Sequence, residues 1–307
     1  MASTPRPLDR FAILGTLALC ACWGLNQVAG KVALPDIGPV TQATLRAAIG
    51  SIVLLIIVRA QRRDIFHADG TLIPGVVAGL LFAFEFIALF LALKATTASS
   101  AAVFFYTAPF FVAVGAAAFL PAERLEARQW VGLALAFLGV VAGLYRAAPG
   151  ATIGGDLLAL VGGAMWGATT VVVKATKLKI IDPVKALLYQ TVASALVSGA
   201  WVYAAGEPLP THLSTLSIVS VVYQSVLVVG ISYAFWFYLL QTYRAGELAA
   251  FTFVTPIVGV FAGAVLLGEP LTVNFLVALA LVVAGLIVVS WPAEKAMFRL
   301  AARSVRQ

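Results

Sequence analysis

Two charged side chains lie deep inside long apolar stretches, and they are the first candidates for chemistry in this chain. Arg46 lies in the stretch 38–58, and Glu85 lies near the middle of the stretch 71–93. A charge at bilayer depth costs about 2.5–3.5 kcal/mol on insertion scales, so such a residue normally faces a partner or an internal cavity. Two interpretations stay open. Either the two charges pair and hold adjacent helices together, or Glu85 binds a proton or an ammonium group while Arg46 binds a carboxylate.

Aromatic side chains in the same apolar stretches are the second signal. Trp and Tyr usually anchor at the membrane interfaces, as we expect of Trp201 and Trp291. Trp23 and Trp166 lie nearer to mid-stretch, where an indole N–H needs a polar or hydrated partner. Asn26 shares the helical face of Trp23. We predict a substrate-binding cavity lined by Trp23, Asn26, Arg46, Phe82, Glu85, Phe86, Phe105, Tyr106, Trp166, Tyr189, Gln190, Tyr233 and Trp236.

The residues that catalysis or metal binding would need are missing from the apolar stretches. His67 and His212 are the two histidines, and both fall in predicted loops. Ser232 has no histidine at its depth to activate it, and an intramembrane serine commonly bonds a carbonyl of its own helix. Cys20 and Cys22 point to different faces of a helix and do not pair. Since no Gly-x-x-x-x-Gly-Lys segment is present either, we predict no enzyme, no metal site and no cofactor.

The composition identifies the bilayer as the solvent of this chain. Of its 307 residues, 62% are hydrophobic and 11% are charged, whereas soluble domains have roughly 45–50% and about 25%. A membrane span needs about 20 apolar residues. We therefore predict an all-α integral membrane protein with ten transmembrane helices, at 11–31, 38–58, 71–93, 97–119, 128–146, 154–174, 184–204, 217–239, 247–267 and 272–291.

The predicted helices fall into two halves that repeat one another. Trp23-Gly24, for example, recurs as Trp166-Gly167. The period of about 145 residues is far longer than that of a solenoid repeat. Five helices in each half is an odd number, so the halves, 10–148 and 152–292, enter the membrane in opposite orientations. Inverted repeats around a central midplane cavity are typical of transporters.

The halves share a scaffold but differ in polar lining. Gln190 takes the place of Arg46 and Ser232 that of Glu85, a difference that an asymmetric substrate requires. Prolines at equivalent places of the two halves predict a symmetric pair of helix kinks, at Pro109 and Pro256. Glycines four residues apart predict close helix packing, a dimer contact or a hinge, at Gly75/Gly79, Gly139/Gly143, Gly163/Gly167 and Gly259/Gly263.

The distribution of basic residues predicts the topology. With the N-terminus in the cytoplasm, the outward segments carry Lys31, Lys94 and Arg146, while the inward segments carry every other Lys and Arg except Arg46. The positive-inside rule therefore places both termini in the cytoplasm. This topology explains the net charge of +7 without nucleic-acid binding. Arg10 and the following apolar run resemble a signal peptide, but the run continues past its cleavage-like residues, so we expect an uncleaved first helix.

Several motifs resemble those of a known family. Trp23-Gly24-Leu25-Asn26 followed by Thr44-Leu45-Arg46 resembles the start of an EamA domain of the drug/metabolite transporter superfamily. The segment 250–271, with Pro256 at its centre and Gly268-Glu269-Pro270-Leu271 at its end, is also similar to that family. The resemblance covers both halves, 10–291. Two departures are Pro121-Ala122-Glu123-Arg124, where the family favours Gly-Glu-Arg, and Thr169, where an Asn is frequent.

The resemblance implies a ten-helix exporter of small metabolites in a bacterial inner membrane. The amino-acid exporters of this superfamily, including the YddG type that exports aromatic amino acids, use a largely apolar central cavity with aromatic side chains from spans one, three, four and six. Relatives that carry phosphorylated sugars need several basic residues at the site, whereas Arg46 is the one deeply placed base here. A zwitterionic or weakly polar, partly aromatic substrate fits better.

The leading prediction is thus a secondary exporter of neutral or aromatic amino acids that works by alternating access. A multidrug or purine/nucleobase exporter of the same superfamily is the alternative, and a membrane-embedded lipid enzyme or a scramblase ranks below it. We expect a small-molecule substrate and the lipid bilayer as partners, no nucleic acid, and either a monomer or a homodimer.

Overall fold

The computed structural model describes residues 9–65, 67–119, 127–145, 149–243, 252 and 254–290, and within these residues it contains helices and no β-strand. Phe251, Trp291 and the charged residues of 1–8, 120–126, 146–148, 244–250 and 291–307 lie outside the described residues. The helices are α1 (Arg10–Ala33), α2 (Pro39–Ala60), α3 (Leu72–Ala95), α4 (Ala98–Phe105), α5 (Ala108–Phe119), α6 (Ala127–Tyr145), α7 (Ile153–Ala175), η1 (Lys177–Ile180), α8 (Pro183–Ala205), α9 (Thr215–Val222), η2 (Tyr223–Ser232), α10 (Tyr233–Thr242), α12 (Val254–Leu267) and α13 (Val273–Ser290).

Six helical segments of the described residues are long and apolar enough to cross a membrane, which makes this a multi-pass membrane protein. They are 10–33, 39–60, 72–95, 98–119, 153–175 and 215–236. Shorter apolar helices occupy 127–142, 254–267 and 273–288. The helix α8 is 23 residues long but falls outside both groups. It carries several buried polar residues, Lys185, Gln190, Thr191, Ser194 and Ser198.

Side-chain caps and prolines fix where many of these helices begin. Asp9 accepts a hydrogen bond from the Ala12 amide at the start of α1, and Thr152 does the same for the Gly155 amide at the start of α7. Pro39 and Pro183 stand at the first positions of α2 and α8, where a missing N–H costs nothing. The starts of these four helices are therefore encoded locally.

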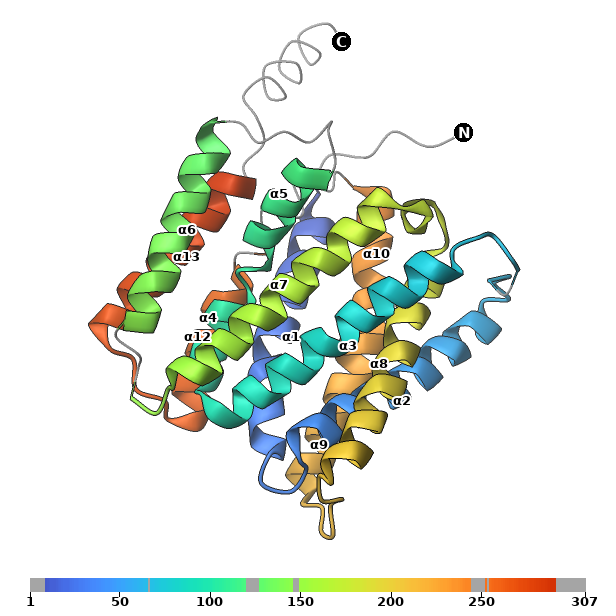
Figure 1. Cartoon of the computed structure of the whole chain (residues 1–307), viewed down its shortest axis with the longest axis horizontal. Helices are drawn as coiled ribbons and strands as arrows, with labels where there is room; N and C mark the ends of the chain where they lie inside the picture. The colour runs from blue at the N-terminus through green and yellow to red at the C-terminus, as the bar shows by residue number, and fades with distance from the viewer. Residues whose placement is uncertain are drawn as a thin grey trace, which may run out of the picture.

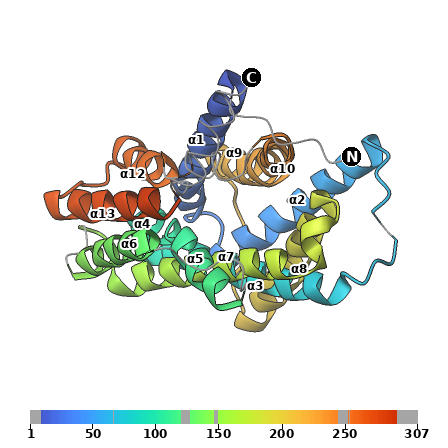
Figure 2. The same cartoon turned by 90° about the horizontal axis from the view of Figure 1, so that it is seen from above.

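The helices form a bundle in which neighbours in space come from both halves of the sequence. Figure 2 shows α1 with α9, α10 and α12 on one side, and α3, α5, α7 and α8 on the other. The long tilted helices α3 and α7 lie side by side, α2 packs against α8, and α6 pairs with α13 at one edge (Figure 1). This interleaving brings residues of α1, α2, α3, α4, α7 and α10 close to one another inside the bundle.

Glycines allow the closest of these approaches. A Cβ on Gly79 of α3 would lie 2.5 Å from the Cβ of Ala193 on α8, and one on Gly139 of α6 would lie 2.7 Å from the backbone nitrogen of Val282 on α13. The glycine pairs singled out by the sequence therefore include positions where two helices of one bundle meet closely.

Two departures from regular α-helix interrupt the predicted spans four and eight. The helix α4 ends at Phe105, and α5 begins at Ala108 with Pro109 as its second residue, so the chain turns at Tyr106 and Thr107. Pro256 is the third residue of α12, and the residue before this helix, 253, is not described. Between α9 and α10 the ten residues of η2 form a π-helix, a rare geometry that is frequent at functional sites.

Candidate functional site

Aromatic rings from three helices form one wall of a cluster in the interior. Phe82 and Phe86 of α3 lie with ring centroids 4.7 Å apart, and Phe86 lies 6.3 Å from Phe105 at the end of α4. The Phe105 ring stacks on Trp166 of α7 at 5.3 Å and 26°. Tyr106 contacts both of them, at 5.5 and 5.8 Å. The turn before Pro109 thus places two aromatic side chains against the repeat-paired Trp166.

A second wall comes from α1 and α10. The Trp23 ring lies 6.1 Å from Tyr233 and 5.5 Å from Trp236. Its indole N–H donates to the Ser232 hydroxyl at 2.8 Å, and the Tyr106 hydroxyl donates to the Trp23 carbonyl at 2.9 Å. This last bond joins the two walls. We call the eight aromatic residues, together with Arg46 and Glu85, the central cluster: Trp23, Arg46, Phe82, Glu85, Phe86, Phe105, Tyr106, Trp166, Tyr233 and Trp236.

Arg46 bridges the two walls of the central cluster. Its guanidinium carbon lies 3.7 Å from the centroid of the Phe86 ring, a favourable cation–π geometry, and its Nη2 donates to the Tyr233 hydroxyl at 3.3 Å. The side chains of Arg46 and Glu85 are 2% and 3% exposed. No ion pair within 4 Å joins them, although both lie in the described part of the chain. The alternative in which the two charges simply pair is therefore not what this conformation contains.

Several buried polar atoms around the cluster have no hydrogen-bond partner among the described residues. They are Glu85 Oε2, Arg46 Nε, Asn26 Oδ1, and both Nε2 and Oε1 of Gln27. Buried polar atoms are normally satisfied, so these atoms are available to a ligand or to another conformation of the protein. The cluster is buried at Glu85, Arg46 and Phe86, whereas Trp166, Tyr233 and Trp236 are partly exposed.

Two predicted cavity residues lie apart from the ring contacts of the cluster. Tyr189 packs on Gly75 of α3. Its hydroxyl lies 3.3 Å from the hydroxyl of Thr71, at the N-terminus of α3. The Gln190 amide is buried in α8 and donates to the Ala186 carbonyl of its own helix at 3.1 Å. Both residues lie on α8, which packs against α2 and α3, so they contribute to helix packing.

Other interior polar residues were not singled out by the sequence. Gln224 of η2 donates to the Gln42 side chain of α2 at 3.4 Å and to Ser220 at 3.3 Å, and Gln27 of α1 is fully buried. Glutamine in an apolar stretch is the signal that could have identified them, since an uncharged polar side chain in a membrane helix also needs a partner.

Polar contacts at one end of the bundle tie five segments together. Lys31 of α1 donates to the Leu93 and Thr96 carbonyls at the end of α3, at 2.6 and 2.5 Å. Asp156 of α7 accepts from the hydroxyls of Thr96 and Ser100, both at 2.6 Å. Glu269, between α12 and α13, accepts from the first amides of α4, Ala98 and Ser99, at 2.6 and 2.8 Å. We call Lys31, Asp156 and Glu269 with these partners the α3–α4 latch.

The same end of the bundle carries two further carboxylates. Glu207, after α8, accepts from the Thr41 amide at 2.7 Å and so caps α2. Asp36, after α1, accepts from the Ser214 amide at 2.8 Å and from the Ser217 hydroxyl at 2.7 Å at the start of α9. Hydrogen bonds from Ser214 and Ser217 lower the pKa of Asp36 to about 2, so the Asp36 carboxylate stays ionised throughout the physiological pH range.

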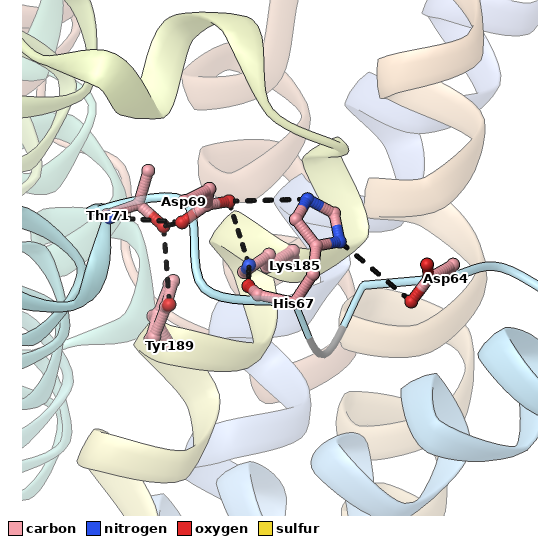
Figure 3. A network of polar contacts seen from close by, with 6 residues as sticks. All are labelled: Asp64, His67, Asp69, Thr71, Lys185 and Tyr189. Atoms are coloured by element: carbon pink, nitrogen blue, oxygen red, sulfur yellow. Dashed lines mark hydrogen bonds and ion pairs between the residues drawn. The ribbon is translucent and has the colours of Figure 1, made fainter.

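The opposite end has a network of its own, which joins the two halves (Figure 3). Lys185 of α8 donates to Asp69 Oδ2 at 2.8 Å, and Thr71 donates to Asp69 Oδ1 through its backbone N–H at 3.0 Å. The His67 ring lies between Asp64 and Asp69, at 3.8 and 3.9 Å. Hydrogen bonds from Lys185 and Thr71 hold the pKa of Asp69 well below its ordinary value.

The described residues contain no group of three or more His, Cys, Asp and Glu side chains that could hold a metal ion. Ser232 donates to the Val228 carbonyl of its own helix at 2.5 Å. The Ser232 hydroxyl therefore donates to its own helix and accepts from the Trp23 indole N–H.

Comparison with known proteins agrees with this geometry. A sequence model of the EamA-like transporter family matches residues 10–144 and again residues 153–291. The chain belongs to the EamA-like transporter family. Together the two matches cover most of the sequence, and several relatives of this chain carry the names of transporters or efflux pumps. The chain is accordingly a membrane transporter and not an enzyme.

Named relatives match over nearly their whole length. A probable amino-acid metabolite efflux pump of Salmonella typhimurium is 29% identical over 282 residues, which cover 88% of this chain and 91% of that protein. The uncharacterized transporter YvbV of Bacillus subtilis is 30% identical over 295 residues, with 92% of each chain covered. The crystal structure of one solved protein superposes on this chain with a TM-score of 0.65 at 20% identity, over 92% of this chain and 96% of the other, which shows a shared fold.

Proposed function

We propose that this transporter exports small metabolites, chiefly neutral and aromatic amino acids, across the inner membrane of a bacterium. The observation that carries the proposal is the central cluster, in which aromatic walls surround one buried base and one buried acid. Aromatic walls suit an apolar or aromatic side chain, and a guanidinium suits a carboxylate. The name of the Salmonella relative, a probable amino-acid metabolite efflux pump, supports the same substrate class.

The proposed architecture is two inverted five-helix repeats, 10–148 and 152–292, around the central cluster. The described helices support it when α4 and α5 are counted as one span, and when α9, η2 and α10 are counted as another. The repeat then pairs α1 with α7, α2 with α8, and α3 with the α9–α10 span. Arg46, Glu85, Trp23 and Trp166 fall on these paired spans, as expected of a site between inverted repeats.

Alternating access in this architecture requires one closed end and one open end. In the orientation that the basic residues favour, the α3–α4 latch lies at the outer face, and its three charged side chains hold α1, α3, α4, α7 and the α12–α13 connection together. The partly exposed rings of Trp166, Tyr233 and Trp236 lie further along their helices toward the cytoplasm. The conformation therefore corresponds to a transporter that is closed to the outside and loads its substrate from the cytoplasm.

Counterflow in proteoliposomes tests the substrate class. Vesicles loaded with unlabelled phenylalanine should take up labelled phenylalanine, and unlabelled tryptophan or leucine outside should compete with it. Lysine and a sugar phosphate are the controls, because neither a second positive charge nor a phosphate matches one buried base and one buried acid. Competition by the sugar phosphate, with none from the neutral amino acids, would overturn the proposed class.

A further inference from the structure

Glu85 is buried without the partners that a carboxylate normally has. It lies near the middle of α3 and is 3% exposed. Its Oε2 has no hydrogen-bond partner among the described residues and no contact with solvent. The adjacent base forms no ion pair with it, because Arg46 contacts the Phe86 ring and the Tyr233 hydroxyl instead.

The ionisable groups around Glu85 can be followed helix by helix. Arg46 on α2 and Tyr233 on α10 interact with it electrostatically. Where α7 passes closest, it presents Gly162, whose Cβ position lies 3.2 Å from the Glu85 carbonyl oxygen. The thiols of Cys20 and Cys22 belong to α1, and α4 carries no ionisable side chain. The remaining charged groups on helices that pack against α3 stand in the first or last turns of those helices or in η1: Arg10, Lys31, Arg59, Asp156, Lys174, Lys177, Lys179 and Lys185.

An ionised carboxylate in this place would leave Oε2 without a hydrogen-bond donor or water. Burying an unpaired charge is far more costly than burying the neutral acid, so the group binds a proton instead. A proton is also the one ligand that needs no free volume, whereas Oε2 has no accessible surface for a metal ion or an organic cation. The described conformation, in which Oε2 has no contact with solvent, therefore matches Glu85 in its protonated form.

We propose that Glu85 is the proton-binding site of the transport cycle and that H⁺ is the coupling ion. The proposal deepens the proposed function and rests on it for the meaning of the cycle. Arg46 Nε also has no hydrogen-bond partner among the described residues, so it is available to the deprotonated form of Glu85. When the helices move, Glu85 releases its proton to water, and the resulting carboxylate is neutralised by the Arg46 guanidinium or by the ammonium group of the substrate. One O–H bond breaks and one proton leaves for each turn of the cycle.

The other buried carboxylate of the described spans has a different environment. Asp156 is fully buried and its Oδ2 also has no partner among the described residues, but its Oδ1 accepts from two hydroxyls at 2.6 Å, and it stands in the first turn of α7. Hydrogen-bond donors and the helix N-terminus stabilise a carboxylate. Asp156→Asn is thus the control for a loosened latch, because it removes a buried acid that accepts hydrogen bonds from Thr96 and Ser100 outside the central cluster.

The test compares Glu85→Gln, Glu85→Asp and Asp156→Asn in proteoliposomes with an imposed pH gradient. With one proton exchanged per substrate, a gradient of one pH unit supports up to about a tenfold substrate gradient. We expect this accumulation in the wild type and in Glu85→Asp, whereas Asp156→Asn, which loosens the latch, should lower exchange and accumulation together. Glu85→Gln should still exchange substrate down its own gradient, but it should show no accumulation driven by the pH gradient. Accumulation by Glu85→Gln would overturn the proposal.

An infrared difference spectrum gives a readout that does not depend on transport. The purified wild type at neutral pH should show the carbonyl band of a protonated carboxylic acid, and Glu85→Gln should lose it while Asp156→Asn keeps it. If the wild type exchanges no amino acid, the proposed function fails, and this band still decides the proton site. A wild type without the band, or a Glu85→Gln variant that keeps it, contradicts the assignment of the proton to Glu85.

Discussion

The indole N–H of Trp23 on α1 donates a 2.8 Å hydrogen bond to the hydroxyl of Ser232, the last residue of the π-helix η2. The bond joins the first half of the sequence to the second. Ser232 also donates to the Val228 carbonyl of its own helix, so one hydroxyl acts as acceptor and as donor. The last residue of the π-helix is therefore the hydrogen-bond acceptor of the Trp23 indole.

Replacing Ser232 by alanine should destabilise the protein and weaken substrate binding. The change leaves a buried indole N–H without its acceptor, at a cost of about 1–3 kcal/mol. Thermal unfolding in detergent measures the first effect, and the KM for counterflow measures the second. Ser225→Ala is the matched control, because the buried Ser225 hydroxyl bonds the Val221 carbonyl of its own helix at 2.7 Å. Equal losses in the two variants would show that the bond to Trp23 contributes nothing specific.

The proposed topology predicts opposite labelling of two exposed loop positions. In a chain whose Cys20 and Cys22 are replaced by alanine, a cysteine at Thr211 should react with an impermeant thiol reagent added to intact cells. A cysteine at Gln61 should react after the cells are opened. Both positions are exposed, so access depends on the side of the membrane alone. The reverse pattern would invert the orientation, and labelling of both positions in intact cells would contradict the ten-helix count.

The depth of Arg46, Glu85, Trp23 and Trp166 within their helices follows from the sequence, because apolar stretches and the internal repeat fix how far each residue lies from a helix end. Their contacts do not follow. Whether Arg46 meets Glu85 or Tyr233 depends on the relative rotation of three helices, which hydropathy does not encode.

Other features of the site depend on long-range packing in the same way. Tyr189 was expected in the cavity, but its side chain lies against Gly75 and Thr71, because the glycines of α3 leave room there. The π-helical geometry of η2 has no local sequence signature, since Tyr223–Ser232 is an ordinary apolar stretch. The turn before α5 is the counter-example, because Pro109 marks it in the sequence.

The Asp69–Lys185 contact should stabilise the protein at neutral pH and lose its effect in acid. Hydrogen bonds from Lys185 and Thr71 keep the pKa of Asp69 below its ordinary value. A carboxyl with a lowered pKa stabilises the folded state above its unfolded-state pKa, about 3.9, and this contribution is lost as the pH falls further. Asp69→Asn should therefore lower the Tm at pH 7 and lower it less at about pH 2, because the contribution shrinks as the pH falls from the unfolded-state pKa toward the lowered pKa of the folded state.

The neighbouring Asp64 provides the control for this pH dependence. Its side chain is 89% exposed and lies 3.8 Å from His67, and exposed pairs contribute little. Asp64→Asn should leave the Tm unchanged at both pH values. A loss as large as that of Asp69→Asn would mean that general charge, and not the Lys185 contact, stabilises this end of the bundle.

The glycine contact between α3 and α8 should not tolerate a side chain. A Cβ on Gly79 would lie 2.5 Å from the Ala193 Cβ and 2.7 Å from the Tyr189 carbonyl oxygen, so α8 would have to move. Overpacking of this kind costs about 1–3 kcal/mol, and we expect Gly79→Ala to lower the Tm. Gly154→Ala, at a helical position with no atom within 4 Å, should be neutral or stabilising. A neutral Gly79→Ala would show that the two helices are less closely packed.

The central claim is that the central cluster binds the transported substrate, and counterflow kinetics of three tryptophan variants test it most directly. Trp23→Ala and Trp166→Ala remove rings of the cluster, whereas Trp201→Ala removes an exposed ring at the far end of α8. An aromatic contact contributes about 0.5–1.5 kcal/mol beyond its buried area, so the two cluster variants should raise the KM for phenylalanine up to roughly tenfold. At equal amounts of folded protein, Trp201→Ala should match the wild type. Identical KM values for all three variants and the wild type would contradict the assignment of the cluster as the substrate site.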